Sequence, residues 1–258
     1  MKWRNTMKKS FGNLVKVGVI AAALGMSSQA HAVAVDLELG LLVDASGSVN
    51  ATEFALQRDA YASAFQSGAI QTAIASGAIG SIAVNYVYWS GAGNQQEAVG
   101  WTLIDSAASA NAFGAAVGAT SRPFFGQTAP GNAIAFEAPL FNNGFDGTRN
   151  VIDVSGDGAQ NNGISTAAAR NAALAGGIDA INGIVIGGSA SVLSFYQNNV
   201  QGGANSFTLT ANSFNDFSGA LNTKLIREIT NVPTPMTPLL ALIGLGALAI
   251  TRRRKQTA

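Results

Sequence analysis

The sequence lacks cysteine altogether and contains a single histidine, His31, close to its N-terminus. Without cysteine the chain can form no disulfide, so packing alone must stabilise its fold. We expect His31 to be removed with an export segment, which would leave no histidine in the mature protein. These two absences exclude a Ser-His-Asp triad, a Cys-His nucleophile, the ordinary zinc sites and histidine-ligated haem.

Charge is also scarce, because Asp, Glu, Lys and Arg make up only 11% of the 258 residues. The net charge of +1 averages unlike parts, since five basic residues lie in 1–32 and four in the last seven positions. The part between them holds six basic and all 14 acidic residues, a net charge of −8. Nucleic acid binding draws on clustered Lys and Arg, so we expect no nucleic acid partner. The sequence also lacks a G-x-S-x-G elbow and a P-loop, which weakens esterase and nucleotide hydrolase interpretations.

Residues 1–32 have the pattern of a secretory signal peptide. A basic stretch precedes a short apolar run at residues 17–26. Ala30-His31-Ala32 then places small side chains at the two positions that a signal peptidase recognises. We therefore expect export with cleavage after Ala32, and an uncleaved membrane anchor is the alternative.

Residues 231–258 are predicted to form a linker, a short hydrophobic helix and a basic tail. Val232-Pro233-Thr234-Pro235 precedes an aliphatic run at 239–250 and four basic residues at 252–255. The run is shorter than the roughly 20 residues that span a bilayer comfortably, and its basic flank favours a cytoplasmic C-terminus. This order resembles the PEP-CTERM sorting signal of Gram-negative bacteria, although Thr234 stands where that signal usually has Glu.

The sorting-signal resemblance implies a route for the whole chain. It implies export across the inner membrane of a Gram-negative bacterium, transient membrane anchoring through the C-terminal helix, and processing by an exosortase-type enzyme. The destination would be the cell surface, the extracellular matrix or the medium. A plain tail anchor is the alternative.

Residues 33–230 alternate strand-like and helix-like segments, and about 200 residues suffice for one domain with a full core. The expected strands are residues 35–43, 81–89, 150–155, 179–186 and 206–210. The expected helices are residues 53–74, 104–117, 129–141, 163–175, 191–199 and 212–229. This alternation favours a mainly parallel central sheet with helices on both faces.

The first expected strand runs directly into Asp44-Ala45-Ser46-Gly47-Ser48. Ligands gather at the carboxyl ends of parallel strands, so this loop is a candidate site. Asp44, Ser46 and Ser48 are hard oxygen donors at alternate positions, and a curled loop can bring them together around Mg²⁺ or Mn²⁺. A helix N-cap is the alternative, since Asp and Ser are also preferred there.

Two later loops add a hydroxyl and a carboxylate to this set. Thr128 stands at the entrance of an expected helix, and Asp157 follows the strand expected at 150–155. The order D-x-S-x-S, Thr, Asp resembles the metal-ion-dependent adhesion site (MIDAS) of von Willebrand factor A-like domains. The resemblance covers about residues 34–230 and is nearest to a bacterial branch of unknown function; Gln127 departs mildly from the family pattern.

By this resemblance the fold is α/β and Rossmann-like, and the domain is a binding module with no enzyme activity. The implied metal ligands are Asp44, Ser46, Ser48, Thr128 and Asp157. The implied cofactor is a divalent cation, with Mg²⁺ expected first and Mn²⁺ or Ca²⁺ as alternatives. So few direct carboxylates leave a coordination position that a carboxylate from a protein or extracellular-matrix partner can complete.

Three other interpretations remain open from the sequence. The chain could be a structural surface or matrix protein with a degenerate metal site. It could be a metal-assisted hydrolase, although no histidine base is at hand. A calcium loop could begin at Asp153, but Ile164 stands where such a loop needs a bidentate Glu.

Overall fold

The computed structural model describes residues 32–231, so the predicted signal peptide and sorting signal lie outside it apart from their boundary residues, Ala32 and Asn231. In chain order the strands are β1 (Val33–Val35), β2 (Leu37–Asp44), β3 (Ile82–Trp89), β4 (Gln95–Ile104), β5 (Phe145–Gly147), β6 (Asn150–Gly156), β7 (Ala180–Ile186), β8 (Gly202–Gly203) and β9 (Thr208–Ala211). The α-helices are α1 (Ala51–Phe65), α2 (Gly68–Ala75), α3 (Ala107–Gly118), α4 (Pro130–Glu137), α5 (Thr166–Ala175), α6 (Ala190–Phe195) and α7 (Phe217–Thr230). A 3₁₀ turn, η1 (Ala138–Phe141), extends α4, and a π-helical turn, η2 (Tyr196–Val200), extends α6.

The central sheet follows the order β4-β3-β2-β6-β7, and both β8 and β9 pair with β7. Strands β3, β2, β6, β7 and β9 run parallel, whereas β4 and β8 are antiparallel to their neighbours. A separate short parallel pair joins β1 to β5. The mainly parallel sheet predicted from the sequence is therefore confirmed, with antiparallel additions at both sides.

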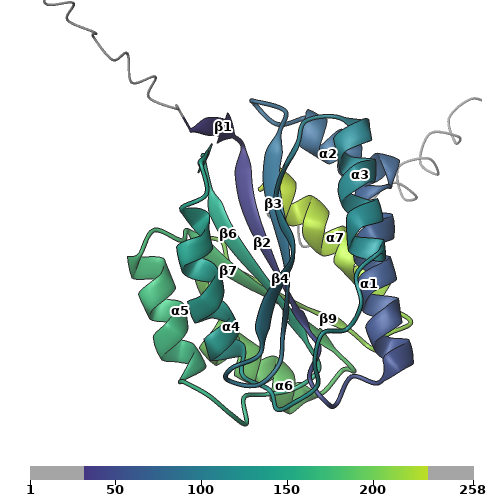
Figure 1. Cartoon of the computed structure of the whole chain (residues 1–258). Coiled ribbons are helices and arrows are strands. Elements are labelled where there is room, and N and C mark those ends of the chain that lie inside the picture. The colour runs from purple at the N-terminus through teal and green to yellow at the C-terminus, as the bar shows by residue number, and fades with distance from the viewer. Residues whose placement is uncertain (1–31, 232–258) are drawn as a thin grey trace, which may run out of the picture. The chain divides into compact units, whose positions relative to one another are not determined.

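Helices cover both faces of this sheet, as Figure 1 shows. One face packs against α1, α2, α3 and α7, and its core contains alternate residues of β2 such as Leu39 and Leu41. The other face packs against α4, α5 and α6, and its core contains Leu42. All eight residues of β2 are buried. A parallel strand covered by helices on both faces has an almost continuously apolar sequence, and β2 follows this rule.

Two local expectations are corrected by the structure. The helix expected at residues 53–74 is two helices, because the Ser67 side chain accepts a hydrogen bond from the Ile70 backbone N–H and begins α2 there. Strand β4 has no counterpart among the expected strands, and its last residue, Ile104, lies in this strand and not in the helix expected at residues 104–117. β4 begins with polar residues and is only partly buried, so it carries little strand signal.

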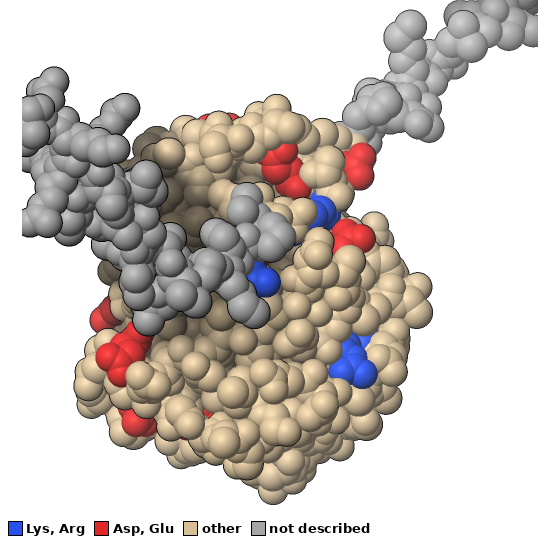
Figure 2. Space-filling view, turned by 180° about the vertical axis from the view of Figure 1, so that it is seen from behind, with Lys and Arg blue, Asp and Glu red and all other residues tan. Residues whose placement is uncertain are grey.

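The surface carries few charged side chains. In Figure 2, lysine and arginine form isolated spots on a face that is otherwise mostly uncharged. Within residues 32–231, no helix is both long enough and apolar enough to cross a membrane. The C-terminal helix predicted from the sequence falls outside this range.

Candidate metal site

The predicted metal site lies where β2 ends and α1 begins. Helix α1 has Asn50 as its N-cap, whose side chain accepts from the Thr52 and Glu53 backbone N–H groups. The Glu53 carboxylate in turn accepts from the Asn50 N–H and completes a capping box. Asp44, Ser46 and Ser48 are therefore not the helix cap, which removes the alternative role that the sequence had left open for them.

A chain of hydrogen bonds joins this loop to the loop after β6. The Asp44 carboxylate accepts from the Ser46 N–H at 2.7 Å, and the Ser46 and Ser48 hydroxyl oxygens lie 3.1 Å apart. Ser48 donates to the Asp157 carboxylate at 2.6 Å. Because β2 and β6 are adjacent parallel strands, with Val43 opposite Ser155, the loops that follow them emerge side by side.

Thr128 faces the same pair of loops from the entrance of α4. A methyl group built on Gly158 would lie 3.5 Å from the Thr128 hydroxyl oxygen, so Thr128 sits against the residue after Asp157. Its backbone is held by Asn161, which accepts from the Thr128 N–H through its side chain and donates its own N–H to the Thr128 carbonyl. The structure thus gathers all five predicted residues at one end of the sheet.

Burial leaves Asp44 without full compensation for its charge. The residue is 0% exposed, and its second carboxylate oxygen has no hydrogen-bond partner. Burial first, and then the nearby Asp157 carboxylate, raise the pKa of Asp44 to about 7, against the lowering effect of the bonds from Ser46. Burial and Glu53 also raise the pKa of Asp157, although the bond from Ser48 lowers it. A buried carboxylate with a free oxygen is what a bound cation would compensate.

The donor set fits a hard divalent cation. It offers two carboxylates and three hydroxyls, all oxygen donors of the kind that Mg²⁺, Mn²⁺ and Ca²⁺ accept. Within residues 32–231 there is no cluster of three or more His, Cys, Asp or Glu that could hold a metal, so a carboxylate-rich or soft-ligand site is not built into this part of the chain.

Arg122 supports the loop and was missed by the sequence analysis. Its guanidinium donates to the backbone carbonyls of Val49, Ala45 and Ser46 and so fixes the curl of the loop. The same group lies 3.9 Å from the centre of the Phe125 ring. Basic residues are scarce in this part of the sequence, and Arg122 is one of only six between the two ends of the chain. That scarcity is the feature of the sequence that could have drawn attention to it.

Gly156 is a second residue that the sequence analysis passed over. A methyl group on it would lie 2.8 Å from the unpartnered Asp44 oxygen and 2.5 Å from the Tyr196 hydroxyl. Only glycine therefore lets β6 pass this close to the buried carboxylate. The feature of the sequence that could have indicated its role is its position between the strand expected at residues 150–155 and Asp157.

Charged residues of a different kind lie between β6, β7 and α7. Lys224, on α7, is fully buried and lies 2.5 Å from both the Asp153 and the Glu228 carboxylates. Asn182 donates to Glu228 at 2.8 Å. Asp153 is therefore paired with Lys224 in the core, which argues against the calcium-loop interpretation that began at this residue.

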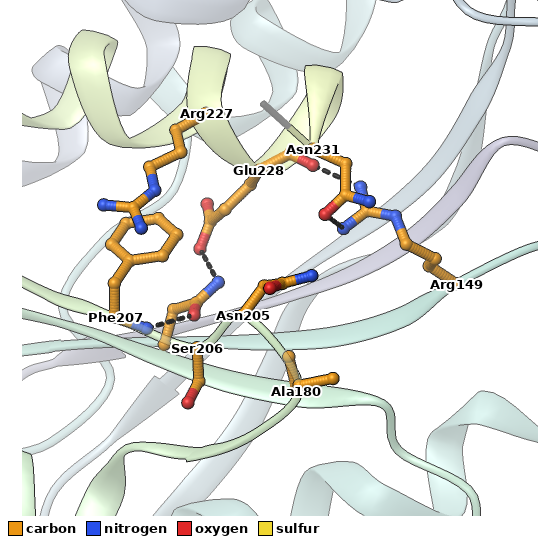
Figure 3. A pocket seen from close by; sticks show the side chains of 10 residues that line it. Arg149, Ala180, Asn205, Ser206, Phe207, Arg227, Glu228 and Asn231 are labelled. Atoms are coloured by element: carbon orange, nitrogen blue, oxygen red, sulfur yellow. Dashed lines mark hydrogen bonds between the residues drawn. The ribbon is translucent and has the colours of Figure 1, made fainter. Parts of the chain in front are cut away.

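A small cavity of about 110 Å³ borders this cluster near the C-terminal end of α7. Figure 3 shows its side chains: Arg227 lies over the Phe207 ring, and Arg149 donates to Asn231 and to the Glu228 backbone carbonyl. These contacts tie the last turn of α7 to the sheet. Most of the polar side chains that line the cavity already bond or stack with one another.

Solved structures similar to this one include surface and matrix proteins with a von Willebrand A-like fold. Proximal thread matrix protein 1 from the mussel byssus matches with a TM-score of 0.58 and 18% identity over 77% of this chain and 49% of that one. The pilus adhesin SpaC from Lactobacillus rhamnosus GG in its open conformation has a TM-score of 0.56 and 16% identity, covering 76% of this chain and 30% of its own. The PilB minor pilin from Streptococcus sanguinis has a TM-score of 0.54 and 15% identity, covering 79% and 64%.

These likenesses establish the fold, and this chain spans less than two thirds of the length of each of those proteins. No curated protein matches it in sequence. One protein family does match, over residues 34–233, which is most of the chain and includes every predicted site residue. The chain therefore belongs to the family described as proteins of unknown function, DUF1194.

Proposed function

We propose that this protein is an exported, metal-dependent binding module that uses the Asp44 loop to engage an acidic group on a protein or matrix partner. The observation that carries the proposal is the fully buried Asp44 with an unpartnered oxygen, beside two serine hydroxyls and Asp157. Within residues 32–231, Asp44 forms no ion pair with a basic side chain. A divalent cation held there, with Mg²⁺ expected first, would compensate its charge.

Each residue has a distinct part in holding such an ion. Ser46, Ser48 and Thr128 offer neutral hydroxyl oxygens, and Asp44 and Asp157 supply negative charge from the ends of two adjacent strands, β2 and β6. The bond from Ser48 to Asp157 keeps the two loops together. When bound, the cation would supply an under-neutralised positive charge with an open coordination position, which a partner carboxylate can fill.

The surface beside the loop has room for a partner. Phe125 is 67% exposed, and Arg122 beneath it holds its ring in place. A cavity of about 550 Å³ also reaches Asp157 and is bordered by Glu53, Ser189 and Phe214. An exposed aromatic side chain next to a charged contact is a common basis for strong local binding.

Two of the similar structures favour this use of the fold. The mussel thread matrix protein has been solved with zinc in a MIDAS motif, and SpaC is a pilus adhesin. Both are extracellular, as the predicted signal peptide implies for this chain. The mussel protein is also a matrix component, which favours a second candidate function: a structural matrix protein in which the site has no partner-binding role.

Metal binding is tested first by thermal unfolding of the full chain in mild detergent, followed by tryptophan fluorescence. A cation at about 100 times its dissociation constant adds roughly 2.7 kcal/mol of stability. For a domain of this size, this corresponds to a rise in Tm of about 5–11 °C. We expect the rise with Mg²⁺ or Mn²⁺, and we expect Asp44→Asn to abolish it.

Asp146→Asn is the matched control, since Asp146 is an exposed carboxylate with no part in the site. It should retain the full rise. An equal response in Asp44→Asn and in the wild type would reject the assignment of the ion to this loop.

Partner binding is tested separately by retention of the protein on matrix extracts with Mg²⁺ or with chelator. A metal-bridged contact requires loss of retention with chelator and with Asp44→Asn. Equal retention under all conditions, together with a normal metal response, would favour the structural role.

A further inference from the structure

A second buried carboxylate without compensation lies under α4, on the face of the sheet that packs against α4, α5 and α6. Glu137 is the last residue of α4 and is 0% exposed. Neither of its carboxylate oxygens has a hydrogen-bond partner. A buried carboxylate is expected to find at least one donor, so two free oxygens require an explanation.

The neighbours of Glu137 come from three adjacent strands. A methyl group on Gly40, in β2, would overlap the Glu137 carboxylate, so this glycine makes the space that the carboxylate occupies. Asn85, in β3, is 0% exposed, and its side-chain oxygen also has no partner. Its amide nitrogen donates to Glu97, in β4, at 3.1 Å. The unpartnered oxygens of two buried residues, Glu137 and Asn85, and a second carboxylate therefore meet in one place.

The β3–β4 ladder is irregular at this point. Its register shifts between Val84 and Tyr86, an interval that contains Asn85, and again between Tyr86 and Val87. Bulges re-aim side chains and are frequent beside functional sites. Glu97 lies on the exposed edge strand, so solvent reaches one side of the group while Glu137 closes the other.

No basic side chain neutralises this group. Within residues 32–231 the ion pairs are Arg58–Asp59, Lys224–Asp153 and Lys224–Glu228, and none involves Glu137 or Glu97. Burial raises the pKa of Glu137 to about 8, with a smaller rise from Glu97 and a lowering by Asn85. The carboxylate must therefore either keep its proton or receive a cation from solution.

We propose that Glu137, Glu97 and Asn85 form a second cation site that takes a hard divalent ion, with Ca²⁺ preferred. Two carboxylates and an amide oxygen are oxygen ligands of the type found in calcium sites. Ca²⁺ accepts six to eight such ligands in irregular geometry, and water from the open side can complete its shell. Mg²⁺ fits less well, because it requires nearly ideal octahedral geometry.

This site is separate from the Asp44 loop. Gly40 precedes Asp44 by four residues of β2, which is about 13 Å along an extended strand. The second site lies along the body of the strands, whereas the first lies beyond their carboxyl ends. The two can therefore be removed independently, and the second does not rest on the proposed function.

The test counts bound Ca²⁺ by isothermal titration of the full chain in mild detergent. The starting protein is Asp44→Asn, which removes the first site. We expect this variant to bind one Ca²⁺ per chain and to show a Ca²⁺-dependent rise in Tm. Adding Glu137→Gln, which keeps the shape of the side chain, should abolish both.

Two further variants keep the outcome clear. Glu97 is exposed on the edge strand, so Glu97→Gln does not alter the packing of the core. We expect this variant to weaken Ca²⁺ binding at least about tenfold. Asp146→Asn in the same background should bind Ca²⁺ normally. If Asp44→Asn binds no Ca²⁺, or if it binds Ca²⁺ equally well with and without Glu137, the proposal is wrong and Glu137 is a protonated core residue.

Discussion

Two groups of buried or half-buried carboxylates in this fold differ in where their compensating charge comes from. Asp153 and Glu228 share the ammonium group of Lys224, which the chain itself delivers from α7. Asp44 and Asp157 share only hydroxyl and backbone donors, and one Asp44 oxygen has none. The first group contains a cation supplied by the chain, although some of its carboxylate oxygens lack a hydrogen-bond partner. The second group contains no such cation and requires a proton or an ion from solution.

The difference separates a structural use of buried charge from a binding use. An internal ion pair is permanent and ties α7 to the sheet at any ion concentration. A carboxylate without an internal cation makes stability depend on the solution, because whatever binds only the folded state stabilises it. Glu137 belongs with the second group by the same criterion. The following experiments test this contrast.

Removing the internal cation should have the largest effect. Lys224→Met would leave two buried carboxylates uncompensated, which costs about 3–5 kcal/mol. We expect a large loss in the free energy of unfolding measured with urea. Adding Asp153→Asn and Glu228→Gln should restore most of it. A Lys224→Met variant of unchanged stability would show that this group also depends on ions from solution.

Closing the space around Asp44 should have the next largest effect. In Gly156→Ala the new methyl group would press on the Asp44 carboxylate and the Tyr196 hydroxyl, and overpacking of this kind costs about 1–3 kcal/mol. We expect a lower Tm and no metal-dependent rise. Gly93→Ala, where nothing lies within 4 Å of the added methyl group, is the control and should change neither.

Loosening the loop should weaken metal binding without destroying the fold. Arg122→Ala removes the donors to three loop carbonyls, and bonds from a charged donor are each worth about 1.5–3 kcal/mol at most. We expect the Mg²⁺ midpoint of the Tm rise to move about tenfold higher. Arg170→Ala loses similar bonds to the Asn198 and Gln201 carbonyls and should leave that midpoint unchanged.

Acidity should reduce the metal response gradually. The pKa of Asp44 is raised to about 7 from its usual 3.8, so protonation competes with the ion as the pH falls below about 7. We expect the apparent affinity to fall up to about tenfold per pH unit. Over the same range, from about pH 7 down to 4, protonation of Asp44 should stabilise the metal-free protein. A Tm rise with Mg²⁺ that is the same at pH 8 and pH 5 would contradict this assignment.

Local patterns in the sequence determined a large part of this protein. Apolar β-branched runs marked the parallel strands, and the spacing of apolar residues marked most helices, because backbone periodicity acts over a few neighbouring residues. Asp44, Ser46 and Ser48 could be found because they directly follow a buried strand. The polar, half-buried β4 and the Ser67 cap between α1 and α2 carried weaker signals.

Only the tertiary structure decided which charges are compensated. Asp44, Asp153 and Glu137 look alike in the sequence, since each is an acidic residue in or beside an apolar segment. Their difference depends on strand order and register, which place Lys224 against one and only Asn85 and Glu97 against another. Such contacts join residues far apart in the chain, and no local periodicity records them. The sequence by itself therefore determined where donors could stand, and the packing of helices on the sheet determined which of them lack a partner.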